Sequence, residues 1–162
     1  MKLSLKFLQR KQACSSGLKW YNEHGQPDTV EACVAALIAD ANEPKNLNYA
    51  SWLLSQTLSE PDCRRYAIFA ARQVIGIYEK QYPEDARPRK SIEAAEAYLE
   101  GKISREELAA AMAAAGAAEA AAGAWDARVA GDAAWAARDA ADREMLLKIV
   151  NYGATLISKG DL

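Results

Sequence analysis

The sequence contains one histidine, His24, and three cysteines that lie far apart, Cys14, Cys33 and Cys63. Zinc sites need several Cys or His ligands at short spacings, so no metal site is expected. A Ser-His-Asp triad would have to recruit His24, and no motif orients this side chain. We interpret His24, which precedes Gly25, as a helix-capping residue, and the cysteines as small buried side chains in a reducing compartment.

Glycine-rich phosphate loops, the GxSxG nucleophile motif and the dinucleotide-binding fingerprint are also missing, because the glycines are isolated. The acidic residues do not follow the spacing of a calcium-binding loop. We therefore expect no catalytic residues, no metal and no cofactor. An enzyme built on this sequence would have to work with carboxylates alone.

The sequence also has little net charge and no long apolar run. The net charge is −2 and the isoelectric point is about 5.5, so nucleic acid is not an expected partner. No apolar signal-peptide core follows the N-terminus, where Lys6, Arg10 and Lys11 intervene. The longest weakly apolar run, Leu108 to Ala118, is far shorter than the roughly 20 residues of a membrane span. These features predict a soluble cytoplasmic protein without a membrane segment.

Helix signals, by contrast, are frequent. Apolar residues recur at helical spacing in most segments, and no segment alternates with a period of two, so the predicted fold class is all-α. Capping boxes are expected at Asp28 with Glu31, Ser59 with Asp62, and Ser104 with Glu107. The first predicted elements are a short helix or arm over 3–8 and a helix capped by Ser15 or Ser16 that ends before Gly25. Amphipathic helices are then predicted to start near Asp28 and near Leu47. Two more are predicted, one from Ser59 that ends by Gln81 and one from Pro88 that ends at Gly101.

The C-terminal third differs in composition, since about twenty of the 33 residues from Ala109 to Ala141 are alanine. Alanine is the best helix former, and its small side chain lets helices approach closely. One unbroken helix from Arg105 to Ser158 would be roughly 80 Å long, too long for a compact domain of this size. We expect a break at Gly116, Gly123 or Gly131, and favour Gly123.

The predicted architecture is a single domain over residues 1–162, a bundle of about six to eight helices. Residues 1–103 supply amphipathic helices. Residues 104–158 form a long Ala-rich helical hairpin that packs on them, and its last part returns to the core with Ile149 and Val150.

Two groups of charged residues are candidates for partner binding. The first, Arg87, Arg89 and Lys90 at a helix start, could contact an acidic partner or phosphates, or form a solvated face paired with Glu84, Asp85 or Glu93. The second is a polar stripe in the Ala-rich helix, which could bind a partner or pair internally at four-residue spacing. The candidate residues of the stripe are Arg128, Asp132, Trp135, Asp139 and Asp142, and the internal pairs would be Arg128 with Asp132 and Asp139 with Arg143.

Aromatic residues could anchor an interface where they are exposed, and belong to the core where they are buried. These are Trp20, Tyr21, Tyr49, Trp52, Trp125 and Trp135.

Three features in the same order resemble a family of immunity proteins from bacteria and phages. They are the opening Ala13-Cys14-Ser15-Ser16-Gly17-Leu18-Lys19-Trp20, the segment Arg87-Pro88-Arg89-Lys90-Ser91-Ile92-Glu93-Ala94-Ala95-Glu96 with its sequel Tyr98 to Gly101, and the Ala-rich tail. The resemblance implies an all-helical, non-enzymatic bacterial or phage-encoded protein that neutralises another macromolecule. It supplies no catalytic residues to carry over.

The resulting hypothesis is a stoichiometric inhibitor of a toxin, nuclease or defence effector, for which an anti-CRISPR protein of a phage is one possibility. Two alternatives remain open. One is a structural protein that self-associates through its Ala-rich helices into a homo-oligomer, and the other is an accessory protein that binds nucleic acid weakly.

Overall fold

The computed structural model describes the backbone of residues 1–41, 43–114 and 133–159; the side chains at 44, 133–142 and 159 lie outside the description. Within these residues the chain is helical, and the one extended pairing is an isolated antiparallel bridge between Lys2 and Thr29. The all-α prediction is confirmed. The chain divides into two compact units, residues 1–63 with 142–162, and residues 64–141.

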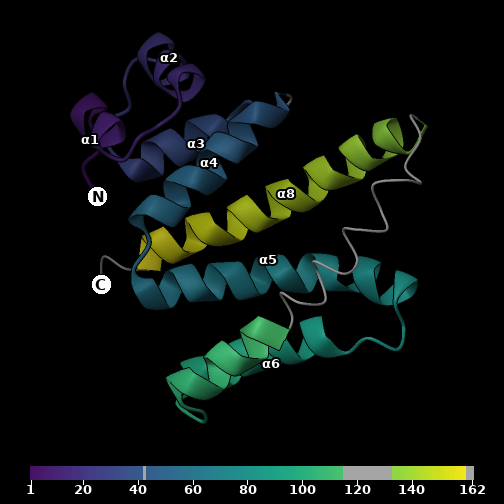
Figure 1. Cartoon of the computed structure of the whole chain (residues 1–162). Coiled ribbons are helices and arrows are strands. Elements are labelled where there is room, and N and C mark those ends of the chain that lie inside the picture. The colour runs from purple at the N-terminus through teal and green to yellow at the C-terminus, as the bar shows by residue number, and fades with distance from the viewer. Residues whose placement is uncertain (42, 115–132, 160–162) are drawn as a thin grey trace. The chain divides into compact units, whose positions relative to one another are not determined.

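Unit 1, residues 1–63 with 142–162, begins with two short helices, α1 (Leu5–Arg10) and α2 (Ser15–Glu23) (Figure 1). The hydroxyl of Ser4 accepts a hydrogen bond from the backbone N–H of Phe7 and starts α1. The predicted cap of α2, Ser15 or Ser16, is wrong by one residue, because the extended Cys14 is the N-cap and its side chain makes no capping bond.

Helices α3 (Val30–Ala39) and α4 (Pro44–Thr57) form the best-packed pair of unit 1. Asn46, which is 3% exposed, donates to the backbone oxygen of Asp40 at 3.1 Å and to its carboxylate at 2.9 Å. This amide therefore fixes the turn between the two helices. Their fully buried side chains include Val30, Val34, Leu37, Leu47, Ala50 and Leu54.

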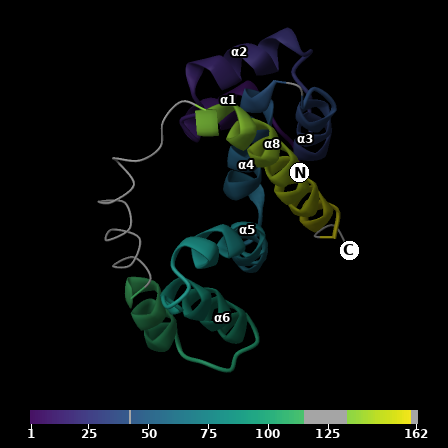
Figure 2. The ribbon, with the colours of Figure 1, turned by 90° about the vertical axis from the view of Figure 1, so that its right-hand side faces the viewer.

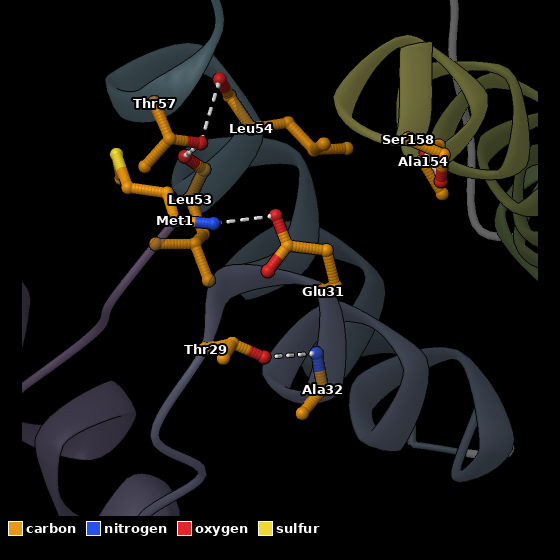
Figure 3. Close-up of polar contacts among 9 residues, drawn as sticks. All are labelled: Met1, Thr29, Glu31, Ala32, Leu53, Leu54, Thr57, Ala154 and Ser158. Atoms are coloured by element: carbon orange, nitrogen blue, oxygen red, sulfur yellow. Dashed lines mark hydrogen bonds and ion pairs between the residues drawn. The ribbon is translucent and has the colours of Figure 1, made fainter. Parts of the chain in front are cut away.

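The C-terminal part of α8 (Ala133–Lys159) runs beside α4 in both views (Figures 1 and 2). From residue 142 onward it belongs to unit 1, where Ile149, Val150 and Leu156 are buried. Leu54 of α4 points toward the turn of α8 that holds Ala154 and Ser158 (Figure 3). The return of this last segment to the core is thus confirmed.

The first residues of the chain lie along the start of α3 (Figure 3). The backbone N–H of Leu3 donates to the oxygen of Asp28 at 2.7 Å, and the Met1 amino group pairs with the Glu31 carboxylate at 2.8 Å. The predicted Asp28–Glu31 capping box is therefore wrong. Thr29 caps α3 instead, accepting from the backbone N–H of Ala32 at 3.1 Å, so the helix begins one residue later than the box requires.

Unit 2, residues 64–141, contains most of α5 (Glu60–Gln81), all of α6 (Arg87–Leu99) and helical residues 105–114. The Ser59–Asp62 box at the start of α5 is confirmed, since the Asp62 N–H donates to the Ser59 hydroxyl at 3.3 Å. The Ser104–Glu107 box is confirmed in both directions, at 2.8 and 3.2 Å. Gly101, with φ of +71°, closes α6 as predicted.

Several other predictions have mixed outcomes. The stripe of α5 is less buried than its pattern suggests, since Val74 is 43% and Ile77 is 59% exposed, whereas Ile75 is buried. Of the cysteines only Cys33 is buried, and Cys14 is exposed. The candidate breaks at Gly116, Gly123 and Gly131, and Trp125, lie outside the described residues. That residues 1–162 form a single domain stays a prediction.

Candidate functional site

The basic residues predicted as a binding cluster lie where α5 turns into α6. The carboxylate of Asp85 accepts four hydrogen bonds in this turn. The donors are the backbone N–H of Arg87 at 3.0 Å, the Arg87 guanidinium at 2.7 and 2.8 Å, and the Tyr78 hydroxyl at 2.8 Å. The pKa of Asp85 lies well below its usual range, mainly because of the hydrogen bonds from the Arg87 guanidinium. Arg87 is thus neutralised by its own neighbour.

Arg89, the second residue of the cluster, reaches back from α6 to α5 and forms a two-pronged ion pair with Glu79. About two helix turns further on, Arg72 of α5 makes the same two-pronged pair with Glu96 of α6, at 3.0 and 2.7 Å. Each arginine lowers the pKa of the carboxyl that it holds. These paired charges fasten α5 and α6 into an antiparallel hairpin.

Farther along the hairpin, the guanidinium of Arg64 lies over the ring of Tyr98, 4.9 Å from its centre. A cation above an aromatic face is attracted by the ring's negative face. The hairpin is therefore joined along its length by charge contacts. Lys90, by contrast, is exposed at the edge of an open hollow lined by residues 81–87.

The structure describes only part of the polar stripe predicted in the Ala-rich segment. Arg128 and Asp132 lie outside the described residues. Trp135, Asp139 and Asp142 belong to α8, but their side chains are outside the description. That the stripe binds a partner stays a prediction, as it does for Arg87, Arg89 and Lys90.

His24 has the structural role that its position predicts. It is the C-cap of α2, and its Nδ1 lies 2.7 Å from the backbone oxygen of Trp20. The imidazole also stacks on the Trp20 ring, with 4.1 Å between ring centres and 13° between planes. In the part of the chain that the structure describes, no group of three His, Cys, Asp or Glu residues is arranged to hold a metal ion.

Unit 1 contains an apolar cavity of about 320 Å³ between α1, α2, α3 and α4, which sequence reasoning did not find. Its walls include aromatic side chains that were left open as core or interface residues. Trp20 and Tyr21 are buried, whereas Tyr49 and Trp52 are half-buried. A cavity depends on how helices meet in space, and no local pattern signals it.

Comparison with known protein families decides what kind of chain this is. The family model described as Imm-5 like putative immunity protein matches residues 53–161, about two thirds of the sequence. The chain belongs to this family. No curated protein and no solved structure matches the chain.

The match places both the hairpin and α8 of this Imm-5 like protein inside the family's shared region. It also gives a structural meaning to the segment from Arg87 to Glu96. Arg89 and Glu96 are hairpin ion-pair residues, Pro88 lies in the first turn of α6, and Ile92 is 9% exposed. In this chain the segment therefore forms most of α6 and pairs it with α5.

The family's description points to an immunity role and a protein partner, rather than to catalysis. In the described part of this Imm-5 like protein, no helix is both long and apolar enough to cross a membrane.

Proposed function

We propose that the protein is a non-enzymatic immunity protein that neutralises a toxin or a defence complex by binding it in a stoichiometric complex. The observation that carries this proposal is the family match over residues 53–161. A phage-encoded inhibitor of a CRISPR effector is a narrower form of the same proposal.

The hairpin of α5 and α6 is the part of the family region best suited to present a fixed surface. Its two cross-helix ion pairs, Arg72 with Glu96 and Glu79 with Arg89, hold its side chains in place before any partner arrives. Binding surfaces that are ordered in advance lose less entropy on association. We place the partner contact at the turn, with Lys90 as its exposed charge and Arg87 and Arg89 beside it.

The remaining proposed contacts are those of the polar stripe that the sequence predicts in the Ala-rich segment. The stripe residues in this proposal are Arg128, Asp132, Trp135, Asp139 and Asp142.

The test begins with capture of partners by the tagged protein from its native bacterium, followed by purification of each captured protein. We expect a complex of defined stoichiometry and loss of the partner's toxic or nuclease activity in proportion to added protein. Lys90→Glu should weaken this inhibition, whereas Lys45→Glu, an exposed lysine in α4, should not. A captured protein that keeps its full activity in the complex would contradict the proposal.

Light scattering on the purified protein separates this proposal from self-assembly. A monomer at high concentration is expected. An oligomer at high concentration would instead favour the structural alternative, in which the Ala-rich segment drives self-association.

A further inference from the structure

The apolar cavity of unit 1 has a closed floor and an open mouth. Leu8 and Leu37, which are 5% and 2% exposed, belong to the floor. The lining residues Gln12, Cys14 and Asn48 are exposed, so they mark the mouth. A molecule from solvent can therefore enter past these three residues.

The lining also indicates what kind of molecule fits. It includes no Asp, Glu, Lys, Arg or His side chain, so a charged group would lose its hydration inside without gaining a partner. Aromatic side chains of two helices form much of the wall, Trp20 and Tyr21 from α2 and Tyr49 and Trp52 from α4. Small-molecule sites are usually of this kind, concave, mostly apolar and rich in aromatic side chains.

One residue at the mouth has an unfavourable backbone conformation. Gln12 follows α1 with a φ of +60°, in the left-handed region where glycine is the usual residue. Gln26, the other non-glycine residue with a positive φ in the described part of the chain, uses its side chain to donate to Asn22 at 3.0 Å. The carboxamide of Gln12 has no such bond to another described residue. Strained residues persist where they have a use, so this side chain indicates a contact that the free protein does not make.

We propose that the cavity binds a small uncharged molecule of about two fused aromatic rings, with one polar end group at the mouth beside Gln12. The volume sets the size of the ligand, since an engineered apolar cavity of about 150 Å³ holds one benzene ring. A cavity of about 320 Å³ therefore fits two fused rings. The inference is independent of the immunity role, because nearly all of the lining precedes the family match at residue 53.

A size series of probes tests the inference on the intact protein by calorimetric titration. The probes are phenol, 2-naphthol and 1-hydroxypyrene, which have one, two and four fused rings and the same polar end. We expect 2-naphthol to bind roughly tenfold more tightly than phenol, because its second ring buries more apolar surface, and more tightly than 1-hydroxypyrene, which is too large. Naphthalene-2-sulfonate, with the same two rings and a charge, should bind at least several-fold more weakly than 2-naphthol. Affinity that rises steadily with ring number, or no saturable binding, would overturn the proposal.

The thiol at the mouth reports where the probe lies. A Cβ at Gly17 would lie 3.3 Å from the Sγ of Cys14 and 3.6 Å from the ring of Tyr49, which places this thiol at the aromatic wall. Bound 2-naphthol should slow the alkylation of Cys14 by a maleimide at least several-fold, while the rate at Cys63, which does not line the cavity, stays unchanged. Equal effects at both cysteines, or none at Cys14, would place the probe elsewhere and overturn the proposal.

A matched pair of variants tests the role of Gln12. Gln12→Gly should raise the melting temperature of the free protein, because glycine adopts a φ of +60° without strain, and should weaken the binding of 2-naphthol at least several-fold. Gln26→Gly removes a glutamine at a φ of +50° that does not line the cavity, so it should leave the affinity unchanged. Equal affinities of 2-naphthol for Gln12→Gly and the unaltered protein would overturn the assignment of the polar end to Gln12.

Discussion

At the scale of single residues, the core of unit 1 depends on a few large side chains that are completely enclosed. Leu54 is 0% exposed and points toward α8, where Val150 is likewise fully buried. Because alanine supplies much of the sequence's apolar content and buries little area, each such leucine carries a large part of the hydrophobic stabilisation.

Leu54→Ala should therefore lower the free energy of unfolding by about 2–5 kcal/mol, through lost burial and the cavity left behind. Urea denaturation followed by circular dichroism measures the change. Ile77→Ala, at a side chain 59% exposed, is the control and should change stability by less than about 1 kcal/mol. Similar losses for the two variants would show that the assigned core is wrong.

The cysteines should differ in reactivity. Hydrogen bonds from the Ser16 hydroxyl and the Gly17 backbone lower the pKa of Cys14, whereas burial raises the pKa of Cys33 to about 11. Since the thiolate is the nucleophile, Cys14 should be alkylated fastest near neutral pH, and Cys33 should react only after unfolding. Peptide mapping by mass spectrometry checks this order, which would be refuted by early modification of Cys33 in the folded protein.

At the scale of elements, the hairpin of α5 and α6 is held by pairs of charges. Glu79 and Glu96 have lowered pKa values in the folded state. Their contribution to the free energy of unfolding is complete above the unfolded-state pKa, near 4. It is lost as the pH falls through the folded-state pKa values. The hairpin should thus weaken as the pH falls below the usual range of a glutamate pKa.

Exchange of the two charges in one pair tests this arrangement. Arg89→Glu should destabilise the protein by placing two carboxylates together, and addition of Glu79→Arg should restore most of the loss. Thermal unfolding at pH 7 gives the comparison, and Glu79→Gln should reduce the dependence of the melting temperature on pH below 5. A double variant as unstable as the single one would mean that the two side chains do not meet.

Two glycines in unit 2 should respond oppositely to alanine. Gly101, at a φ of +71°, holds a left-handed conformation that disfavours side chains, so Gly101→Ala should cost about 1–2 kcal/mol. Gly76 lies within α5 with open space around its Cβ position, so Gly76→Ala should stabilise by about 0.5–1 kcal/mol. Urea midpoints of both variants give the signs, and two changes in the same direction would contradict this assignment.

The sequence predicts those elements whose causes are local. The Ser59–Asp62 and Ser104–Glu107 boxes and the end of α6 at Gly101 depend on residues a few positions apart. Likewise, Asp85 was among the expected partners of the basic cluster, because it adjoins Arg87.

Where the sequence misleads or is silent, the cause is distant along the chain. Asp28 and Glu31 form no capping box because Thr29 is the N-cap, while the first residues of the chain pair with the Asp28 oxygen and the Glu31 carboxylate. The fork between Arg72 and Glu96 requires the register of two helices, which neither helix specifies alone. The cavity requires four helices at once.

At the scale of the whole molecule, the two ends of the chain meet in one unit, because residues 142–162 complete the unit that begins at Met1. Val150→Asp should therefore unfold unit 1, since an unpaired charge would replace a fully buried side chain. Asn151→Asp places the same charge on the adjacent, exposed position and should be tolerated. Protease resistance of residues 1–63 is the readout, and unchanged resistance of Val150→Asp would contradict this closure.

Because both ends of the chain belong to unit 1, the order in which the two units can fold during synthesis is fixed. The hairpin of α5 and α6 has all its ion-pair partners as soon as residue 96 has emerged. Helices α3 and α4, although made earlier, must wait for Ile149, Val150 and Leu156 before their apolar faces are covered. Exposed apolar surface of this kind favours aggregation during synthesis. The oldest part of the nascent chain is thus the last to finish folding, and it is where a chaperone would have the longest time to bind.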